Sequence, residues 1–241
     1  MKDFLKYTAA TVTGLLAFTV IIAAIGMMSI VGMIASSESS GPVEDNSVLV
    51  IPLTGSLQER AEDNILSRIA GQTGAEVGLD EILDGIRKAK DNEKIKGIYI
   101  EAGAFQADSY ASLQAIRKSL LDFRKSGKWI VAYGDSYTQA TYYIASVADK
   151  VMLNPQGVID WHGIASQQFY LKDLMAKFGV RMQLAKVGAY KSAPEMFTAD
   201  KMSEPNREQV TAYITGVWQN ILKEVSESRN ISKEQLNLYA D

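Results

Sequence analysis

The sequence predicts an α/β fold with a mainly parallel sheet, preceded by one N-terminal transmembrane helix. Short apolar runs rich in Val and Ile alternate along the chain with segments whose apolar residues recur at helical spacing. Ahead of these segments, residues 7–37 carry no charged side chain. The nearly apolar stretch 15–34 is long enough to cross a hydrocarbon core of roughly 30 Å.

The N-terminal stretch is expected to be a retained membrane anchor. The apolar region of a cleaved signal peptide is only about 7–15 residues long, which is shorter than this run. Lys2 and Lys6 precede the apolar stretch and acidic residues follow it, so the basic end should stay in the cytoplasm. We therefore expect residues 1–37 to form the cytoplasmic end and anchor, residues 38–46 a linker, and residues 47–241 one α/β domain on the far side of the membrane.

The β/α alternation sets the expected elements of that domain. Helices are predicted at 79–91 and around 113–120, where Leu and Ile recur every three or four residues. Buried strands are predicted between and around them, at 47–53, 95–101, 129–134 and 150–155. Strands joined through helices run parallel, which gives the predicted sheet.

Further elements are expected in the C-terminal third of the chain. Residues 167–178 should form a helix closed by Gly179, and residues 180–187 a strand that leads to Lys191. The apolar stripe from Val210 to Val225 predicts a long helix packed in the core or against another subunit. Ser232, three residues before Gln235, resembles a capping box that opens one more helix.

Composition excludes several classes of function. The 25 basic and 28 acidic residues are nearly balanced, which makes nucleic acid an unexpected partner. With no cysteine and a single histidine, His162, no metal site is expected. No strand immediately precedes the glycines at 71, 74 and 78, so they make no dinucleotide fingerprint.

Two residues that suggest a serine hydrolase have simpler interpretations. Ser136 in "GDSYT" lacks the second glycine of a G-x-S-x-G elbow, so we interpret it as part of a polar helix cap. His162 lies beside Trp161 in a glycine-containing turn, and no triad order can be assembled around it. It is interpreted as a hydrogen-bonded structural residue.

Lys191 is the candidate catalytic residue. It lies in "VGAYKSAPE" (187–195), among small and apolar side chains. An amine acts as a general base only when it is neutral, and burial among apolar neighbours favours the neutral form. Lys191 could therefore serve as the base for a serine, as in Ser–Lys variants of the catalytic triad. A solvated loop lysine is the alternative interpretation, since most lysines are exposed.

The segment 130–228 resembles the N-terminal half of the long form of signal peptide peptidase A, also called the protease IV family. The block "GAYKSAPE" and the following "MSEPNREQ" are the specific part of the resemblance. It implies a ClpP/crotonase-like fold and a Ser–Lys peptidase anchored in the bacterial inner membrane, with its catalytic domain outside the cytoplasm. It also implies that Lys191 is the general base, that signal peptides and other apolar peptides are substrates, that no cofactor is needed, and that the protein forms homo-oligomers.

One departure from the family pattern bears on catalysis. Short-form members carry the nucleophile in an S-G-G-Y-Y segment, and the aligned letters here are "QATYY" (139–143), with Gln139 in place of serine. Long-form members have a second copy of the domain that carries the serine. The resemblance therefore implies that this chain is the lysine-bearing half, interrupted at Asp241, and is nearly silent alone. A non-catalytic membrane scaffold and a crotonase-like acyl-CoA enzyme remain as alternatives.

Overall fold

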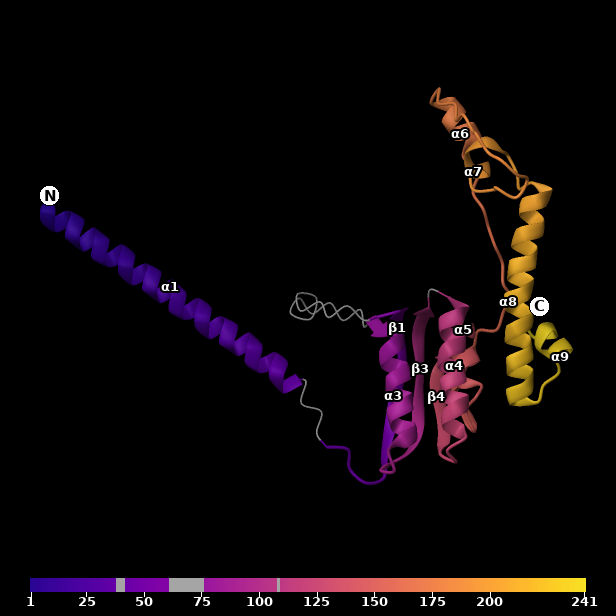
Figure 1. Ribbon diagram of the computed structural model, residues 1–241, viewed down its shortest axis with the longest axis horizontal. Helices are drawn as coiled ribbons and strands as arrows, with labels where there is room; N and C mark the ends of the chain where they lie inside the picture. The colour runs from indigo at the N-terminus through magenta and orange to yellow at the C-terminus, as the bar shows by residue number, and fades with distance from the viewer. Residues whose placement is uncertain (38–41, 61–75, 108) are drawn as a thin grey trace. The chain divides into compact units, whose positions relative to one another are not determined.

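The computed structural model describes residues 1–37, 42–60, 76–107 and 109–241. The chain divides into two compact units, Met1–Glu44 and Asp45–Asp241, which are drawn in Figure 1. The division falls inside the predicted linker 38–46, of which residues 38–41 lie outside the described residues.

The first unit is built on one long helix, α1 (Lys2–Ser37). Its stretch Lys2–Ser29 has a mean hydropathy of 2.1 and is the one helix in the described ranges that is long and apolar enough to cross a membrane. Thr8, Thr11 and Thr19 each donate a hydroxyl hydrogen bond to the backbone carbonyl four residues earlier. These threonines thus satisfy their own polar groups within the helix, as a hydrocarbon environment would require.

The second unit contains a five-stranded sheet in the order β2-β1-β3-β4-β5, and every pairing in it is parallel. The predicted fold class is confirmed, and the strands predicted at 47–53, 95–101, 129–134 and 150–155 are all present, each longer than expected. The strands are β1 (Ser47–Gln58), β2 (Glu76–Gly78), β3 (Ile95–Ala107), β4 (Trp129–Tyr137) and β5 (Lys150–Ile159). The three-residue strand β2 was not predicted, since so short a segment carries no period.

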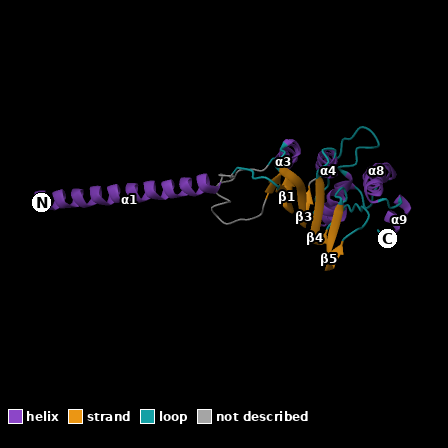
Figure 2. Cartoon of the chain, turned by 90° about the horizontal axis from the view of Figure 1, so that it is seen from below, coloured by secondary structure: helices purple, strands orange, loops and turns teal. Residues whose placement is uncertain are grey.

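Helices cover one face of this sheet. The helices α3 (Leu79–Asp91) and α4 (Tyr110–Arg124) lie on the same side of the strands (Figure 2), and α5 (Gln139–Ala145) follows β4. Ile98 and Ile100 of β3 point to the covered face and are fully buried in the core beside Ile116 and Phe123 of α4. Burial of each such side chain contributes about 1.5–3 kcal/mol.

The chain then forms a segment that extends away from the sheet and returns as α8. This segment contains α6 (Lys172–Lys177) and α7 (Glu195–Thr198), which lie beyond the N-terminal end of α8 (Glu204–Arg229) in Figure 1. The final helix, α9 (Lys233–Leu238), packs beside α8. The cap predicted at its start is confirmed, because the Ser232 hydroxyl accepts the amide hydrogen of Gln235 at 3.1 Å.

Two predictions for the extended segment were wrong. Residues 180–187 form no strand, and the helix predicted at 167–178 is reduced to the six residues of α6, although Gly179 ends it with a positive φ as expected. Phe169, Phe178 and Met182 are exposed. A strand needs a neighbour for its backbone groups and an apolar helix face needs a surface to cover, and the described part of this unit offers neither here.

The long helix α8 is confirmed, and its apolar stripe divides into two parts. Ile221, Leu222 and Val225 are buried in the core, whereas Tyr213, nearer the N-terminal end, is exposed. The C-terminal half of the stripe is therefore core, which was one of the two predicted roles. The N-terminal half of the stripe instead lies beside the extended segment that contains α6 and α7 (Figure 1).

Candidate active site

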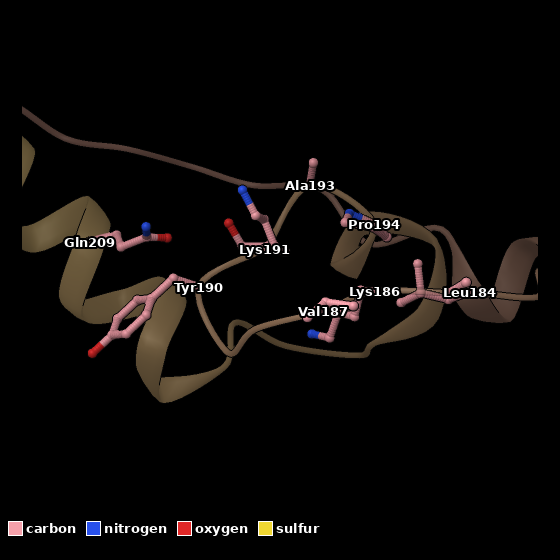
Figure 3. A pocket seen from close by; sticks show the side chains of 10 residues that line it. Leu184, Lys186, Val187, Tyr190, Lys191, Ala193, Pro194 and Gln209 are labelled. Carbon is pink, nitrogen blue, oxygen red and sulfur yellow. The ribbon is translucent and has the colours of Figure 1, made fainter.

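Lys191 lies on the loop between α6 and α7, close to the first turns of α8. The loop borders a pocket of about 730 Å³ whose lining is largely apolar, with Leu184, Val187 and Pro194 beside Tyr190 and Lys191. Figure 3 shows the Lys191 side chain between Gln209 of α8 and Ala193. Gly188 adopts a φ of +97°, a left-handed conformation that glycine reaches without strain, so the loop can turn there just before Lys191.

The expected burial of Lys191 is not found in this chain. Lys191 is exposed, and its ammonium has no hydrogen-bond or ion-pair partner in the described ranges. Val187 beside it is 90% exposed. The prediction from the small and apolar neighbours was wrong because these side chains line an open loop, and a lysine becomes desolvated only when a second surface covers it.

The loop is attached to α8 through Glu195, a residue that the sequence analysis did not single out. The Glu195 side chain is buried, at 5% exposure. Its carboxylate accepts hydrogen bonds from the Ser203 hydroxyl at 2.5 Å, the Ser203 amide at 3.2 Å and the Asn206 side-chain amide at 3.1 Å. The Ser203 hydroxyl, more than any other group, holds the pKa of this carboxyl below its ordinary value.

A sequence signal for this attachment exists. Ser203 is the N-cap of α8, with its hydroxyl oxygen accepting the Asn206 amide hydrogen at 3.3 Å, and Pro205 occupies the first turn. A serine followed by an acidic residue and proline is a typical helix start. What the sequence could not show is that the same hydroxyl also binds Glu195, eight residues earlier.

Gln139 occupies the first position of α5 and is buried. Its side-chain amide donates to the Tyr110 hydroxyl at 2.9 Å, and its carbonyl oxygen accepts the backbone amide of His162 at 3.1 Å. Both ends of the amide are therefore engaged, and the structure provides no nucleophile at this position. Lys191 lies on the extended segment between α6 and α7, whereas Gln139 begins α5, the helix that follows strand β4.

The two residues that suggested a serine hydrolase, Ser136 and His162, lie in a strand and in a hydrogen-bonded turn. Ser136 lies in strand β4, and the cap of α5 is Thr138, whose hydroxyl accepts the Thr141 amide hydrogen at 3.2 Å. The interpretation of Ser136 as a cap was therefore wrong by two residues, because β4 continues further than its apolar run. His162 is hydrogen-bonded as expected, with Nδ1 lying 2.8 Å from the Gly163 carbonyl oxygen. In the described ranges, no group of three His, Asp or Glu side chains is placed to hold a metal.

Comparison with known proteins bears on the chemistry of this loop. Residues 122–241, which include Lys191, Glu195 and Ser203, match the model for peptidase family S49. Protease 4 of Salmonella typhi is 43% identical over 161 residues, covering 67% of this chain and 26% of that protein. Through this segment, the chain belongs to peptidase family S49. The resemblance on which the function was predicted is confirmed at the level of the family.

More distant proteins also match. The chloroplastic serine protease SPPA of Arabidopsis thaliana is 24% identical over 194 residues, which cover 80% of this chain and 27% of that protein. A solved enoyl-CoA hydratase/isomerase family protein from Silicibacter pomeroyi matches 83% of this chain and 95% of its own at 12% identity, with a TM-score of 0.30. That score is too low to support a fold or a function, and the fold assignment rests on the strand order described above. The chain spans about a quarter of the length of the two proteases.

Proposed function

We propose that this chain supplies the general-base lysine, Lys191, of a membrane-anchored serine peptidase that hydrolyses cleaved signal peptides. The observation that carries the proposal is the position of Lys191 within the S49 segment, on a loop that borders a largely apolar pocket. The relatives described above are named as proteases, one of them as a serine protease.

Under this proposal the serine comes from outside residues 1–241, since Gln139 stands where the short-form nucleophile aligns and both ends of its side-chain amide are hydrogen-bonded. When the surface that carries the serine covers the Lys191 loop, water is displaced and the neutral amine is favoured. Lys191 Nζ then takes the proton of the serine hydroxyl as its oxygen attacks the scissile carbonyl carbon. The resulting ammonium returns that proton to the departing amine, and water later hydrolyses the acyl-enzyme.

The apolar helix α1 fits this role as a tether. It would hold the catalytic unit beside the bilayer in which cleaved signal peptides remain. The basic residues Lys2 and Lys6 before the span favour a cytoplasmic N-terminus. Under this proposal, residues 45–241 lie on the extracytoplasmic side of a bacterial inner membrane, where homo-oligomers of the peptidase assemble.

Replacement of Lys191 in the intact, membrane-integrated protein tests the proposal. Lys191→Ala should lower the hydrolysis of a fluorogenic apolar peptide by roughly 10²–10⁴-fold, the usual contribution of a general base. The matched control is Lys177→Ala, because Lys177 is an exposed lysine of α6 that does not line the pocket. Wild-type turnover by Lys191→Ala would refute the proposal.

The two alternative functions give different results in the same preparation. A non-catalytic scaffold would show no peptide hydrolysis even with the wild-type sequence. An acyl-CoA enzyme would bind a short-chain acyl-CoA in calorimetry and leave the peptide intact. Both outcomes would count against a peptidase.

A further inference from the structure

Glu195 is a buried carboxylate whose hydrogen-bond partners, within the described part of the chain, are all neutral. Its oxygens accept hydrogen bonds from the hydroxyl and backbone amide of Ser203 and from the side-chain amide of Asn206. A carboxylate at 5% exposure is costly unless its oxygens are satisfied. Both oxygens are satisfied here, and the start of α8 adds the positive end of a helix dipole.

The Ser203 hydroxyl joins the loop to α8. It donates to Glu195 and accepts from the backbone amide of Asn206, the first-turn group that an N-cap normally satisfies. Asn206, also buried, extends the link by donating to Gln168 Oε1 at 3.0 Å. The Asn206 side-chain amide therefore links the Glu195 carboxylate to Gln168, which joins the chain around residues 168, 195 and 203–206.

A single turn connects this attachment to Lys191. The Glu195 backbone amide donates to the Ser192 carbonyl at 2.9 Å, and Pro194 restricts the backbone between them. Ser192 is the residue after Lys191. The position of the Lys191 backbone relative to the start of α8 is therefore fixed through Glu195.

A second contact on the other side of Lys191 is weaker. The Tyr190 hydroxyl donates to Glu208 of α8 at 2.9 Å, but both side chains are exposed. An exposed hydrogen bond exchanges readily with water and contributes little to stability. Glu195 is thus the principal attachment of the loop.

We propose that Glu195 is a positioning residue for Lys191, which holds the loop on the N-terminus of α8 so that the amine meets the serine hydroxyl in one defined place. This inference rests on the proposed function. Glu195 itself does not touch the substrate, since its carboxylate is buried and fully engaged. Its effect should therefore fall on the rate of the chemical step and not on peptide binding.

The test compares Glu195→Ala and Glu195→Gln in the intact, membrane-integrated protein. The measured quantity is the rate at which the fluorogenic peptide is hydrolysed, divided by the amount of folded protein. Glu195→Ala should lower kcat by about 100-fold, the cost of a misplacement near 1 Å, with KM close to the wild-type value. Glu195→Gln retains the length and one acceptor oxygen, and should give an intermediate kcat. This partial rescue distinguishes positioning from a general loss of packing.

A matched control removes an equivalent helix cap elsewhere. Ser232 caps α9 as Ser203 caps α8, with no contact to the Lys191 loop. Ser232→Ala should leave kcat unchanged, whereas Ser203→Ala should lower it and Ser203→Thr, which keeps the hydroxyl, should restore it. If Glu195→Ala does not fold, the Ser203 pair supplies the same comparison.

The outcomes separate this inference from the proposed function. Loss of activity in Lys191→Ala together with wild-type kcat in Glu195→Ala or Ser203→Ala would overturn the positioning role alone. Full activity in Lys191→Ala would overturn the proposed function and, with it, any role of Glu195 in placing a base. A Glu195→Ala protein that loses affinity and keeps kcat would also contradict the inference.

Discussion

Arg117 joins three helices of the second unit through one buried guanidinium group. It is 1% exposed and donates to the Tyr143 and Glu224 carbonyl oxygens at 2.6 and 2.5 Å, and to the hydroxyls of Ser146 and Ser228. Its Nε lies 3.3 Å from Glu224 Oε2, in an ion pair without hydrogen-bond alignment. Desolvation lowers the pKa of Arg117. The planar fork of arginine suits a site with this many acceptors.

Arg117→Ala should destabilise residues 45–241 by about 3–5 kcal/mol, because it leaves Glu224 and several buried acceptors without their donor. Urea unfolding followed by tryptophan fluorescence measures the change. Arg87→Ala is the matched control, since Arg87 forms an exposed ion pair with Asp84 on α3 and should cost less than about 1 kcal/mol. Equal effects of the two replacements would show that Arg117 does not organise the core.

Among secondary-structure elements, α3 depends on a residue that lies outside it. The Lys128 ammonium, just before β4, donates to the carbonyl oxygens of Ala89, Lys90 and Asn92 at 2.7, 2.9 and 2.8 Å. The last carbonyl groups of a helix have no partners within it, and a cation there also interacts favourably with the helix dipole. Lys128 therefore connects the end of α3 to the start of β4.

Lys128→Met keeps much of the aliphatic chain and removes the three hydrogen bonds. It should destabilise the unit by about 1–2 kcal/mol and increase amide hydrogen exchange at the C-terminal turn of α3. Lys125→Met, a replacement of an exposed lysine that ion-pairs with Asp122, serves as the comparison. Unchanged exchange at residues 86–92 in Lys128→Met would refute the role of Lys128.

At the scale of the whole molecule, the apolar helix and the α/β unit are separate compact bodies. Among the residues that the structure describes, the buried apolar side chains of the hydrophobic core all belong to the second unit and lie between Ile51 and Leu236. Folding of the α/β unit should therefore not depend on α1.

If α1 anchors the protein as proposed, deletion of residues 1–44 should move it from the carbonate-resistant membrane fraction to the supernatant, because a span of this length and hydropathy would be the main source of its membrane affinity. The thermal unfolding of the remaining unit should be unchanged. A control in which another apolar transmembrane helix replaces residues 7–37 should restore membrane retention. Retention of the deleted protein in the membrane would show that the second unit has its own membrane surface.

The predictions that were confirmed depend on local sequence, and those that failed depend on contacts between distant parts of the chain. The strands at 47, 95, 129 and 150 and the caps of α9 and of α6 follow from periodicity and from single residues such as Ser232 and Gly179. The failed strand at 180–187 has the right residue types, but a strand also requires a partner for its backbone. Local pattern cannot supply that partner.

The candidate site follows the same rule. Lys191 was identified from its block of sequence, and the family match includes that block. Its exposure and its attachment through Glu195 and Ser203 were not predictable, because the two residues are eight positions apart and meet only when the loop folds back on α8.

The sequence by itself determined the parallel α/β architecture, the apolar N-terminal helix and the lysine that the family match contains, because periodicity, length and residue type are local properties of the chain. Only the tertiary structure decided that Lys191 lies in solvent in this chain, that Gln139 is fully engaged at the start of α5, and that Glu195 fastens the loop to α8. These features depend on which distant groups meet, since burial and hydrogen bonding between distant segments arise from packing.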